Sequence, residues 1–379
     1  APRNGVYNVG SLSRGAANPK LTPPAQSTSI RAEAITFAET LKSAGYVTAH
    51  VGKFHVSATP EAIKTQHGFD VNYGGGAKGE GGSAGYFAVP AGNDRTGAWR
   101  FTNMGPKMAP FATPYTAEYI ERSLRPWAKG NDPATLVGTP KHLTDAQGDA
   151  ALDFLDRYRS GTDRDKPFFL NVAFNAVHTA IRPRPDLAAK YAKLPLTDPR
   201  HTNRDYAALI DQLDQTAGRI LARLDDPNGD GDKGDSIAAN TLVLFVSDNG
   251  GFAGATVNTP LRGAKGMFSE GGIRVPMIAR WPGAVPAGAT SAAAVHLVDL
   301  YPTLTTVAGA KMPDTKAQPL DGVSLAAVLR GQEKTPAGRD SLYWHFPGYL
   351  DTRAVPCSVI VKDRKEEGRR FKLLYFYED

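Results

Sequence analysis

Hydrophobic and polar positions along this chain alternate with the period of a helix in some stretches and form short apolar runs in others. Helical spacing of apolar residues predicts helices over 29–43, 144–158 and 204–224. Between them lie short, largely apolar runs rich in β-branched residues, which predict strands over 47–54, 168–174, 241–246 and 273–280. Because helices and buried strands alternate, we expect an α/β fold with a largely parallel central sheet flanked by helices.

The pattern changes near residue 335. Beyond this point, short strand-like runs predict a small antiparallel sheet with strands over 341–346, 358–361 and 371–377. We therefore divide the chain into a large α/β domain of residues 1–335 and the beginning of a small carboxyl-terminal subdomain of residues 336–379. A glycine-rich stretch over 72–115 has no regular pattern, which is typical of a functional loop, and we expect it to line a ligand cleft.

Two of the strand-like runs end in side chains suited to an anion or to proton transfer. Lys53 and His55 close the run that begins at Val47, and residues two apart in an extended chain face the same way. His178 follows the run over 168–174. Taken singly, a solvated lysine or a hydrogen-bonded structural histidine is the more common explanation of such residues. Their recurrence at successive strand ends favours a shared site.

Two further segments add oxygen donors and a second lysine. Asp248 and Asn249 follow the run over 241–246, at the strand end where open α/β sheets place their ligands. Both supply the hard oxygen atoms that calcium or magnesium prefers, although an ordinary Asp-Asn-Gly turn is the more common explanation of the pair alone. Lys265 lies in the segment 260–276, whose glycines let the backbone approach a ligand closely. A surface turn with ordinary salt links is an equally good interpretation of that segment alone.

These segments, in this order, resemble motifs of the type I sulfatases. Residues 52–55 are similar to the family's Gly-Lys-Trp-His motif, and residues 173–179 resemble Ala-x-x-x-Pro-His-x-Pro, with Val177 in place of the first proline. Residues 247–250 match the Asp-Asn-Gly metal segment, and residues 260–276 resemble Leu-Arg-Gly-x-Lys…Glu-Gly-Gly-x-Arg-Val-Pro. The resemblance implies an alkaline-phosphatase-like α/β core with a smaller sheet packed against it. It also implies hydrolysis of a sulfate ester of an aryl compound or a carbohydrate.

The resemblance implies a role for each candidate catalytic residue. Lys53 and Lys265 are expected to hold sulfate oxygens, because fixed cations in a dry site stabilise developing negative charge. His178 is expected to protonate the leaving alcohol, and His55 to accept a proton in the step that expels sulfate. We expect these groups to meet in one pocket built for a tetrahedral oxyanion beside a divalent ion.

The resemblance also implies one calcium ion, with Asp248 and Asn249 supplying part of its oxygen shell. His345, in the small subdomain, is a candidate substrate contact, and a packing histidine explains it at least as well. Glu270 and Arg274 are interpreted as structural residues that brace the loop around Lys265.

The sequence departs from the family at the nucleophile. The family uses a formylglycine, which is made from the cysteine, or in some members the serine, of a Cys-x-Pro-x-Arg motif. The only cysteine here, Cys357, has neither that proline nor that arginine near it, and the segment 11–14 lacks the proline. The family's Asp-Asp pair is also absent. We therefore expect a fragment whose missing amino-terminal segment carries the formylglycine. We expect this fragment to be inactive, and to be poorly soluble because strand edges are left unpaired.

Composition excludes several other classes of protein. The net charge of +6 and the pI near 9.2 suit an anionic ligand, but there is no Lys/Arg block of the kind that nucleic-acid modules carry. No apolar run reaches the length of a membrane helix, and one cysteine excludes an internal disulfide framework. Residues 226–232 have the opening spacing of an EF-hand loop but Ile237 where its last glutamate belongs, so we interpret them as a solvated acidic turn.

Three functions stay open from the sequence. The first is a sulfatase that acts on a small-molecule or glycan sulfate ester, without nucleic acid or membrane as a partner and with no indication of its oligomeric state. The second is a phosphonate or phosphodiester hydrolase of the same superfamily. The third is a non-catalytic binder of sulfated glycans, against which the intact Lys53, His55, His178 and Lys265 argue. Family members are commonly periplasmic or secreted, and we expect the same location here.

Overall fold

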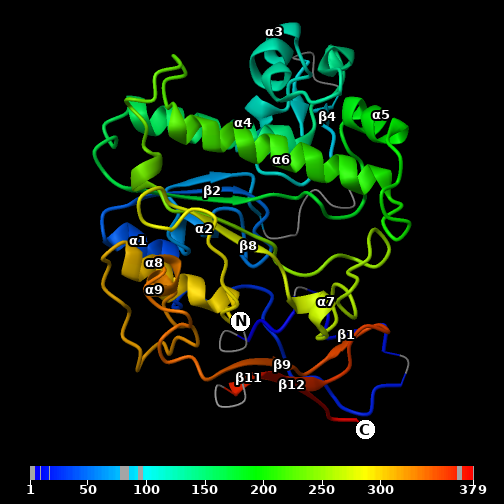
Figure 1. The fold of residues 1–379 in the computed structure, drawn as a ribbon, viewed down its shortest axis with the longest axis vertical. Coiled ribbons are helices and arrows are strands. Elements are labelled where there is room, and N and C mark those ends of the chain that lie inside the picture. Colours follow the sequence, from blue (N-terminus) through cyan, green and yellow to red (C-terminus); the bar gives the residue numbers. More distant parts are fainter. Residues whose placement is uncertain are drawn as a thin grey trace. The chain divides into compact units, whose positions relative to one another are not determined.

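The structure is a computed structural model in which residues 5–8, 10–16, 18–76, 85–92, 97–364 and 369–378 are described. Two parts of the predicted 72–115 loop, 77–84 and 93–96, lie outside the described residues. The chain divides into two compact units, whose elements are labelled in Figure 1. Residues 45–237 form the central unit, and residues 1–44 together with residues 238–379 form the terminal unit.

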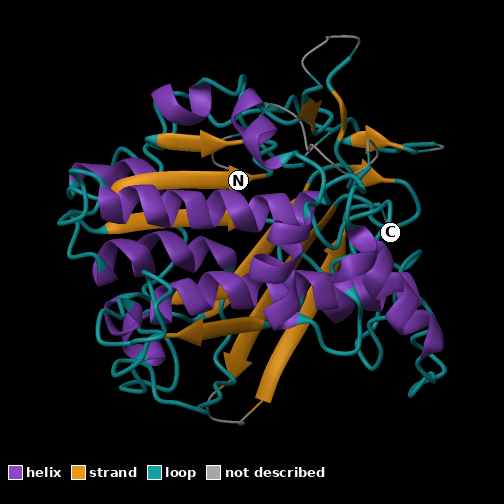
Figure 2. Cartoon of the chain, turned by 90° about the horizontal axis from the view of Figure 1, so that it is seen from above, coloured by secondary structure: helices purple, strands orange, loops and turns teal. Residues whose placement is uncertain are grey.

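A three-stranded parallel sheet organises the central unit (Figures 1 and 2). Strand β2 (Val47–Gly52) lies between β3 (Val71–Tyr73) and β6 (Phe168–Ala173), with Gly52 opposite Ala173 in the register. The residues of β2 from Thr48 onward are buried, which explains the nearly continuous apolar run that the sequence shows there. The parallel arrangement brings the carboxyl ends of β2 and β6 to the same edge of the sheet.

Two long helices pack against each other beside this sheet. Helix α4 (Leu143–Ser160) contacts β2 and β6, and α6 (Arg204–Asp225) contacts α4 and α5 (Pro185–Lys193). Helix α4 begins after His142, whose Nδ1 accepts a hydrogen bond from the Thr144 N–H, so His142 caps the helix that the sequence predicts to start at Thr144. The side chain of Asn203 caps α6 in the same way, by accepting from the Tyr206 N–H.

The remaining central elements are short. They are α2 (Ala62–Thr65), β4 (Val89–Pro90), β5 (Trp99–Arg100), η2 (Pro106–Phe111), α3 (Ala117–Tyr119), η3 (Ile120–Leu124), η4 (Arg125–Trp127) and η5 (Pro133–Leu136). Strands β4 and β5 form an antiparallel pair. The sequence predicts no regular structure over 72–115, so the prediction is wrong for this part of the stretch.

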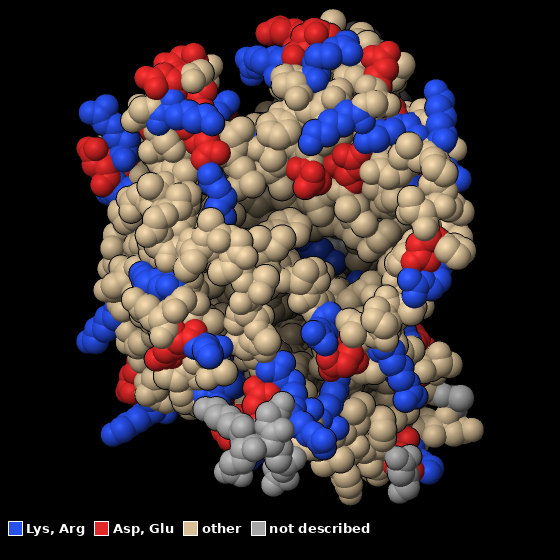
Figure 3. Space-filling view, viewed as in Figure 1, with Lys and Arg blue, Asp and Glu red and all other residues tan. Residues whose placement is uncertain are grey.

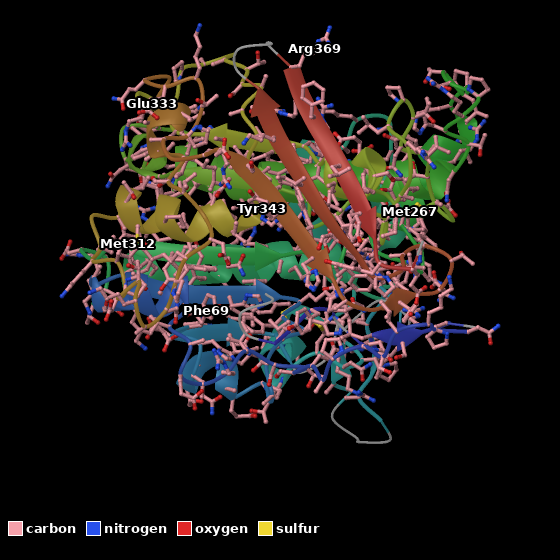
Figure 4. The ribbon with its side chains drawn as sticks, turned by 90° about the horizontal axis from the view of Figure 1, so that it is seen from below. Phe69, Met267, Met312, Glu333, Tyr343 and Arg369 are labelled. Atoms are coloured by element: carbon pink, nitrogen blue, oxygen red, sulfur yellow. The ribbon has the colours of Figure 1, made fainter. Side chains whose placement is uncertain are left out.

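The terminal unit contains two sheets that bear on the candidate site. Strand β7 (Val243–Val246) pairs antiparallel with β8 (Met277–Arg280). The predicted parallel pairing is therefore found in the sheet of the central unit but not between these two strands. Strands β9 (Ser341–Phe346), β11 (Cys357–Arg364) and β12 (Arg369–Phe376) form an antiparallel sheet in the order β12-β11-β9. Figure 4 looks onto this sheet, with Tyr343 and Arg369 labelled. It is the small carboxyl-terminal sheet that the sequence predicts.

The other elements of the terminal unit connect and cover these sheets. Strand β1 (Ser13–Arg14) pairs parallel with β10 (Tyr349–Leu350), and α1 (Phe37–Ser43) packs against α8 (Leu300–Val307). The remaining short elements are η6 (Ala238–Asn240), α7 (Glu270–Ile273), η7 (Leu297–Asp299) and α9 (Ala326–Leu329).

Two predicted boundaries in the terminal unit are wrong. The helix expected from Ser29 begins only at Phe37, because Thr36 and Glu39 form a capping box that fixes the amino terminus there. The strand expected from Ile273 begins at Met277. The preceding residues form α7, because Gly271 and Gly272 are held too close to neighbouring carbonyl groups to extend. A Cβ on Gly271 would lie 2.2 Å from the Gly263 oxygen.

Candidate active site

The turn that carries Lys53 is shaped by the sheet edge. The Lys53 N–H donates to the Ala173 carbonyl over 3.0 Å, which joins the ends of β2 and β6. Gly52 has φ +94°, and a Cβ there would lie 2.2 Å from the same Ala173 oxygen, so only glycine fits this turn. Because β2 ends at Gly52, Lys53 and His55 are not in an extended strand, and the two-residue alternation does not apply to them.

Phe54 anchors the turn between Lys53 and His55. Its ring stacks on His67 with centroids 5.5 Å apart, and meets His50 edge-on at 5.1 Å. His55 has φ +65°, a left-handed backbone conformation that is uncommon outside glycine and that histidine, like asparagine and aspartate, adopts more often than other residues. The packed phenyl ring and the turned backbone together give Lys53 and His55 defined places beside the end of β2, where each is partly exposed.

The turn that carries His178 begins two residues after β6 ends. Asn175 is buried, and its carbonyl oxygen accepts the His178 N–H over 2.9 Å. The imidazole Nδ1 of His178 lies 2.7 Å from the Thr179 carbonyl oxygen. Because a carbonyl only accepts, this contact assigns the hydrogen to Nδ1 and makes Nε2 the nitrogen suited to proton exchange. The structure thus places the Lys53 and His178 turns side by side at one edge of the central sheet.

Two buried side chains that the sequence analysis did not single out hold the Asn175 turn. Gln147 on α4 exchanges hydrogen bonds with Asn175, and the Tyr86 hydroxyl donates to the Asn175 and His178 carbonyl groups over 2.9 and 2.8 Å. Burial raises the pKa of Tyr86 above its ordinary value, which keeps the phenol protonated as a donor. The sequence did offer a signal for Gln147, because it is a polar residue at an apolar position of the predicted helix.

In the terminal unit, the loop after β7 is bound to the 260–276 segment through the backbone. The Gly250 N–H donates to Gly272 O and the Lys265 N–H donates to Gly251 O, each over 2.9 Å. A Cβ on Gly250 would lie 1.8 Å from the Gly271 oxygen, so the two segments touch along their main chains. The structure therefore brings Lys265 together with the Asp248–Asn249 loop.

Asn258 locks this arrangement and was also missed from the sequence. Its Oδ1 accepts the Gly251 N–H over 3.0 Å, and its Nδ2 donates to the carbonyl groups of Gly251 and Gly263. No periodic or motif signal marks a single loop asparagine of this kind. Glu270 lies 3.0 Å from Lys372 Nζ of β12 and 3.9 Å from Arg274, which agrees with a bracing role for Glu270 and Arg274.

The donor set for a cation is partial. Asp248 is exposed at the end of β7, and the Asn249 side-chain amide donates to the Asp248 carboxylate. A carboxylate and an amide oxygen are the donors that a hard cation such as calcium takes. Within the described residues, no group of three or more His, Cys, Asp or Glu side chains is placed to hold a metal ion. The pair therefore fits part of a calcium shell rather than a complete one.

Two other predicted positions lie on the carboxyl-terminal sheet. His345 is exposed on β9, where its Nδ1 lies 3.0 Å from Ser358 Oγ and its ring meets Tyr377 edge-on. Ser358 is on β11 and Tyr377 directly follows β12, and a role of His345 in binding substrate stays a prediction. Cys357 is buried on β11, and burial raises the pKa of its thiol to about 11, so it has neither the motif nor the acidity of a nucleophile.

The candidate residues thus form two groups. Lys53, His55 and His178 belong to the central unit, and Asp248, Asn249 and Lys265 belong to the terminal unit. Each group is organised by its own backbone contacts. The expectation that both groups share one pocket stays a prediction.

Comparison with known proteins identifies the family. Residues 13–310 match the family model described as Sulfatase, and residues 264–379 match the one described as N-sulphoglucosamine sulphohydrolase, C-terminal. The chain belongs to the sulfatase family. Within its described residues, no helix combines the length and apolar character needed to cross a membrane.

Individual relatives agree with this assignment. A protein described as Sulfatase from Formosa agariphila is 45% identical over 393 residues, covering 100% of this chain and 68% of that protein. Arylsulfatase G of Rattus norvegicus is 29% identical, covering 79% of this chain and 54% of the relative. The crystal structure of Ps i-CgsB in complex with k-i-k-neocarrahexaose superposes with a TM-score of 0.63 at 26% identity, covering 94% of this chain and 70% of that one. The chain therefore spans about two thirds of the first relative and about half of the second.

Proposed function

We propose that the protein containing this chain is a sulfuric ester hydrolase that removes sulfate from a sulfated carbohydrate. The observation that carries the proposal is the match of residues 13–310 to the sulfatase family, with the motif residues held at strand ends by buried backbone contacts. A carbohydrate is favoured over a simple aryl sulfate because a similar solved structure contains an oligosaccharide, k-i-k-neocarrahexaose. A polysaccharide substrate lies outside the cell, which favours a periplasmic or secreted enzyme.

In the proposed mechanism, cations hold the sulfate and a histidine assists the leaving group. Lys53 and Lys265 bind non-bridging sulfate oxygens, where fixed positive charge stabilises the transition state more than water does. His178 donates a proton from Nε2 to the departing sugar oxygen, while the contact of Nδ1 with the Thr179 carbonyl holds the ring in orientation. His55 accepts a proton in the step that releases sulfate.

The proposal includes one calcium ion and a formylglycine nucleophile. Asp248 and Asn249 would contribute oxygen ligands to the ion, which when bound supplies positive charge and orients the sulfate. The formylglycine has no counterpart in this chain, since Cys357 is buried outside the family motif. A chelator is expected to abolish turnover and added calcium to restore it. The Asp248→Ala variant is expected to bind less calcium when its metal content is measured directly.

The decisive experiment uses the intact protein carrying this chain, produced with its formylglycine formed. We expect release of sulfate from sulfated oligosaccharides and from 4-nitrophenyl sulfate, with little release of phosphate from 4-nitrophenyl phosphate. Lys265→Ala is expected to lower kcat/KM about 100-fold, as removal of a group that stabilises transition-state charge does. Lys311→Ala, an exposed lysine of the same unit, is the matched control and should behave as the parent.

The same assays separate the alternatives. Preferential hydrolysis of the phosphate ester or of a phosphonate would replace the proposal with the related hydrolase of the same superfamily. Tight binding of sulfated glycans without turnover, by a protein whose nucleophile has been confirmed by mass spectrometry, would indicate a binding protein.

A further inference from the structure

Gln147 makes a set of contacts that no part of the proposed mechanism uses. It lies on α4 with its side chain fully buried, and its carboxamide meets the chain where β6 ends. Its Nε2 donates to Asn175 Oδ1 over 2.8 Å, and the Asn175 N–H donates back to its Oε1 over 3.2 Å. Both polar ends of Gln147 are therefore bonded to the same residue. A buried amide with both ends satisfied in this way has one preferred orientation.

The same side chain lies against the turn before Lys53. Gln147 Nε2 is 3.4 Å from the Ala173 carbonyl oxygen, which is also the acceptor of the Lys53 N–H. A Cβ on Gly52 would lie 2.4 Å from Gln147 Nε2. Gln147 thus contacts both turns of the sheet edge, the one that leads to Lys53 and the one that leads to His178.

Tyr86 holds the second turn from another direction. Its fully buried hydroxyl donates to the carbonyl groups of Asn175 and His178, which are the first and last residues of the turn. The Tyr86 ring stacks on His142, with centroids 5.0 Å apart and planes 8° apart. His142 is itself fixed by a contact of Nε2 with the Arg182 carbonyl oxygen over 2.9 Å. The hydroxyl of Tyr86 is therefore held in place by a rigid aromatic pair.

We propose that Gln147 and Tyr86 are positioning residues for sulfate-ester cleavage, which fix the 175–178 turn so that His178 reaches the leaving oxygen. This inference rests on the proposed function, and in particular on His178 as the proton donor. Proton transfer requires hydrogen-bond distance between donor and acceptor, and a displacement of about 1 Å can cost ~100-fold in rate. Neither residue touches the substrate in this proposal. Each acts through the backbone that carries His178.

A positioning role differs measurably from a general structural role. A substrate with an acidic leaving group departs without a proton, whereas a sugar or a weakly acidic phenol needs one. Loss of alignment of His178 is therefore expected to slow the poor leaving groups selectively. A general loss of folded protein or of active-site integrity lowers the rate for every substrate by the same factor.

The test measures kcat and KM for a series of aryl sulfates with phenols of increasing pKa, using the intact protein and the variants Gln147→Met and Tyr86→Phe. For the least acidic phenol we expect kcat to fall about 10-fold to 100-fold, with KM nearly unchanged. For 4-nitrophenyl sulfate we expect a much smaller loss. His178→Ala should show the same dependence more steeply, and the double variant His178→Ala/Gln147→Met should show no additional dependence on the leaving group.

Gln212→Met is the matched control. Gln212 is also fully buried in the central unit, but its carboxamide bonds to Asp145 and Arg184 rather than to the 175–178 turn. Any loss that it causes should be equal across the series. Tyr86→Phe removes one hydroxyl group and keeps the ring. If Gln147→Met does not fold, Tyr86→Phe alone therefore tests the positioning role.

The outcomes distinguish this inference from the proposed function. A parent protein without sulfatase activity would overturn the proposed function itself. An active parent whose His178→Ala variant depends on the leaving group, but whose Gln147→Met and Tyr86→Phe variants lose the same factor for every substrate, would overturn the positioning role alone.

Discussion

At the residue scale, two buried histidines of the central unit, His142 and His50, are held in one neutral tautomer. His142 accepts a hydrogen bond from the Thr144 N–H at Nδ1 over 3.1 Å, and its Nε2 lies 2.9 Å from the Arg182 carbonyl oxygen, which can only accept. A second proton on the ring would face the Thr144 donor. Burial lowers the pKa of His142 to about 4, because the charged ring would lose its hydration.

His50 on β2 is held in a similar way. Its Nε2 lies 3.1 Å from the Gly52 carbonyl oxygen and its Nδ1 lies 3.0 Å from the Asn171 amide nitrogen. Burial again lowers the pKa, to about 4. Both rings support the sheet edge that carries the candidate site, since His50 lies on β2, the strand that leads into the Lys53 turn, and His142 stacks on Tyr86.

These pKa values predict that the chain loses stability in mild acid. An unfolded histidine titrates near pH ~6.5, so between that pH and about 4 the unfolded chain binds protons that the folded chain does not. The free energy of unfolding should therefore have its full value above pH ~6.5. It should fall as the pH is lowered towards 4, by up to ~3 kcal/mol for each histidine. Denaturant unfolding followed across this range measures the slope.

Replacement of one histidine isolates its contribution to this slope. His142→Gln should be less stable at neutral pH, because the histidine's contacts are lost, but its unfolding free energy should depend less on pH. His201→Gln, an exposed position of the same unit, should keep the full pH dependence. An undiminished slope in His142→Gln would show that His142 is not among the groups that titrate.

Part of the site could be predicted at this scale and part could not. Lys53 and Asp248 were identifiable because they stand at or just after the ends of strand-like runs, although the run predicted over 47–54 ends at Gly52, and the structure places both residues beyond the ends of β2 and β7. Gln147 and Asn175 are 28 residues apart, and their contact exists only once α4 lies beside β6. Hydrogen bonds of this kind depend on tertiary packing, which periodicity along one segment does not contain.

At the scale of elements, long periodic helices were predicted more accurately than short segments. Helix α6 spans Arg204–Asp225 against the expected 204–224, because an apolar stripe over many turns is an unambiguous signal. The ends of α1 and β8 were misplaced, because they depend on the Thr36 capping box and on the close backbone contacts of Gly271 and Gly272. Single local interactions set these boundaries, whereas many residues set a helix.

The contact between α4 and α6 depends on a glycine. A Cβ built on Gly148 would lie 2.4 Å from Thr216 Cγ2 on α6. We expect Gly148→Ala to destabilise the chain by about 1–3 kcal/mol, as overpacking of a tight interface does, in spite of the higher helix propensity of alanine. Chemical denaturation measures the loss.

A second substitution tests the cause of that loss. Thr216→Ser removes the methyl group that the new Cβ would meet and keeps the hydroxyl, which donates to the Gln212 carbonyl over 2.9 Å. The double variant Gly148→Ala/Thr216→Ser should therefore recover most of the stability. If it is no more stable than Gly148→Ala, steric conflict with Thr216 is not the reason for the loss.

At the scale of the whole molecule, the division of the chain was not predictable from its composition. The sequence places a boundary near residue 335, which stays a prediction, and packing divides the chain in another way, into residues 45–237 and the two flanking segments, 1–44 with 238–379. Contacts such as those of α1 with α8 join segments that are far apart in the chain. A scan along the sequence detects a change of pattern, but it does not detect which distant segments pack together.

Charge at this scale agrees with the sequence analysis. On the face seen in Figure 3, basic side chains lie beside acidic ones at several places, and much of the surface between them is uncharged. The net charge of +6 is thus spread over the chain rather than gathered in a block. Such a distribution favours recognition of individual sulfate groups at specific lysines over general electrostatic attraction along a polyanionic chain.

One face of the carboxyl-terminal sheet carries large exposed apolar side chains (Figure 4). Tyr343, Leu373 and Tyr375 are 69%, 63% and 61% exposed. The register pairs Ile360 of β11 with both Tyr343 and Leu373, which places these side chains on one face. The opposite face carries the buried core of this sheet, including Val359. A contiguous apolar surface on an otherwise mixed exterior promotes association.

We therefore expect the isolated 379-residue chain to bind a hydrophobic dye and to self-associate as its concentration rises. Tyr343→Lys together with Leu373→Lys should lower dye fluorescence and shift size-exclusion elution towards the monomer. The free energy of unfolding should change by less than ~1 kcal/mol, because both side chains are already in water. Val137→Lys replaces an apolar residue that is 50% exposed in the central unit, and should change neither measurement. If Val137→Lys, which adds one lysine, has about half the effect of the variant that adds two, association depends on overall charge and not on the sheet face.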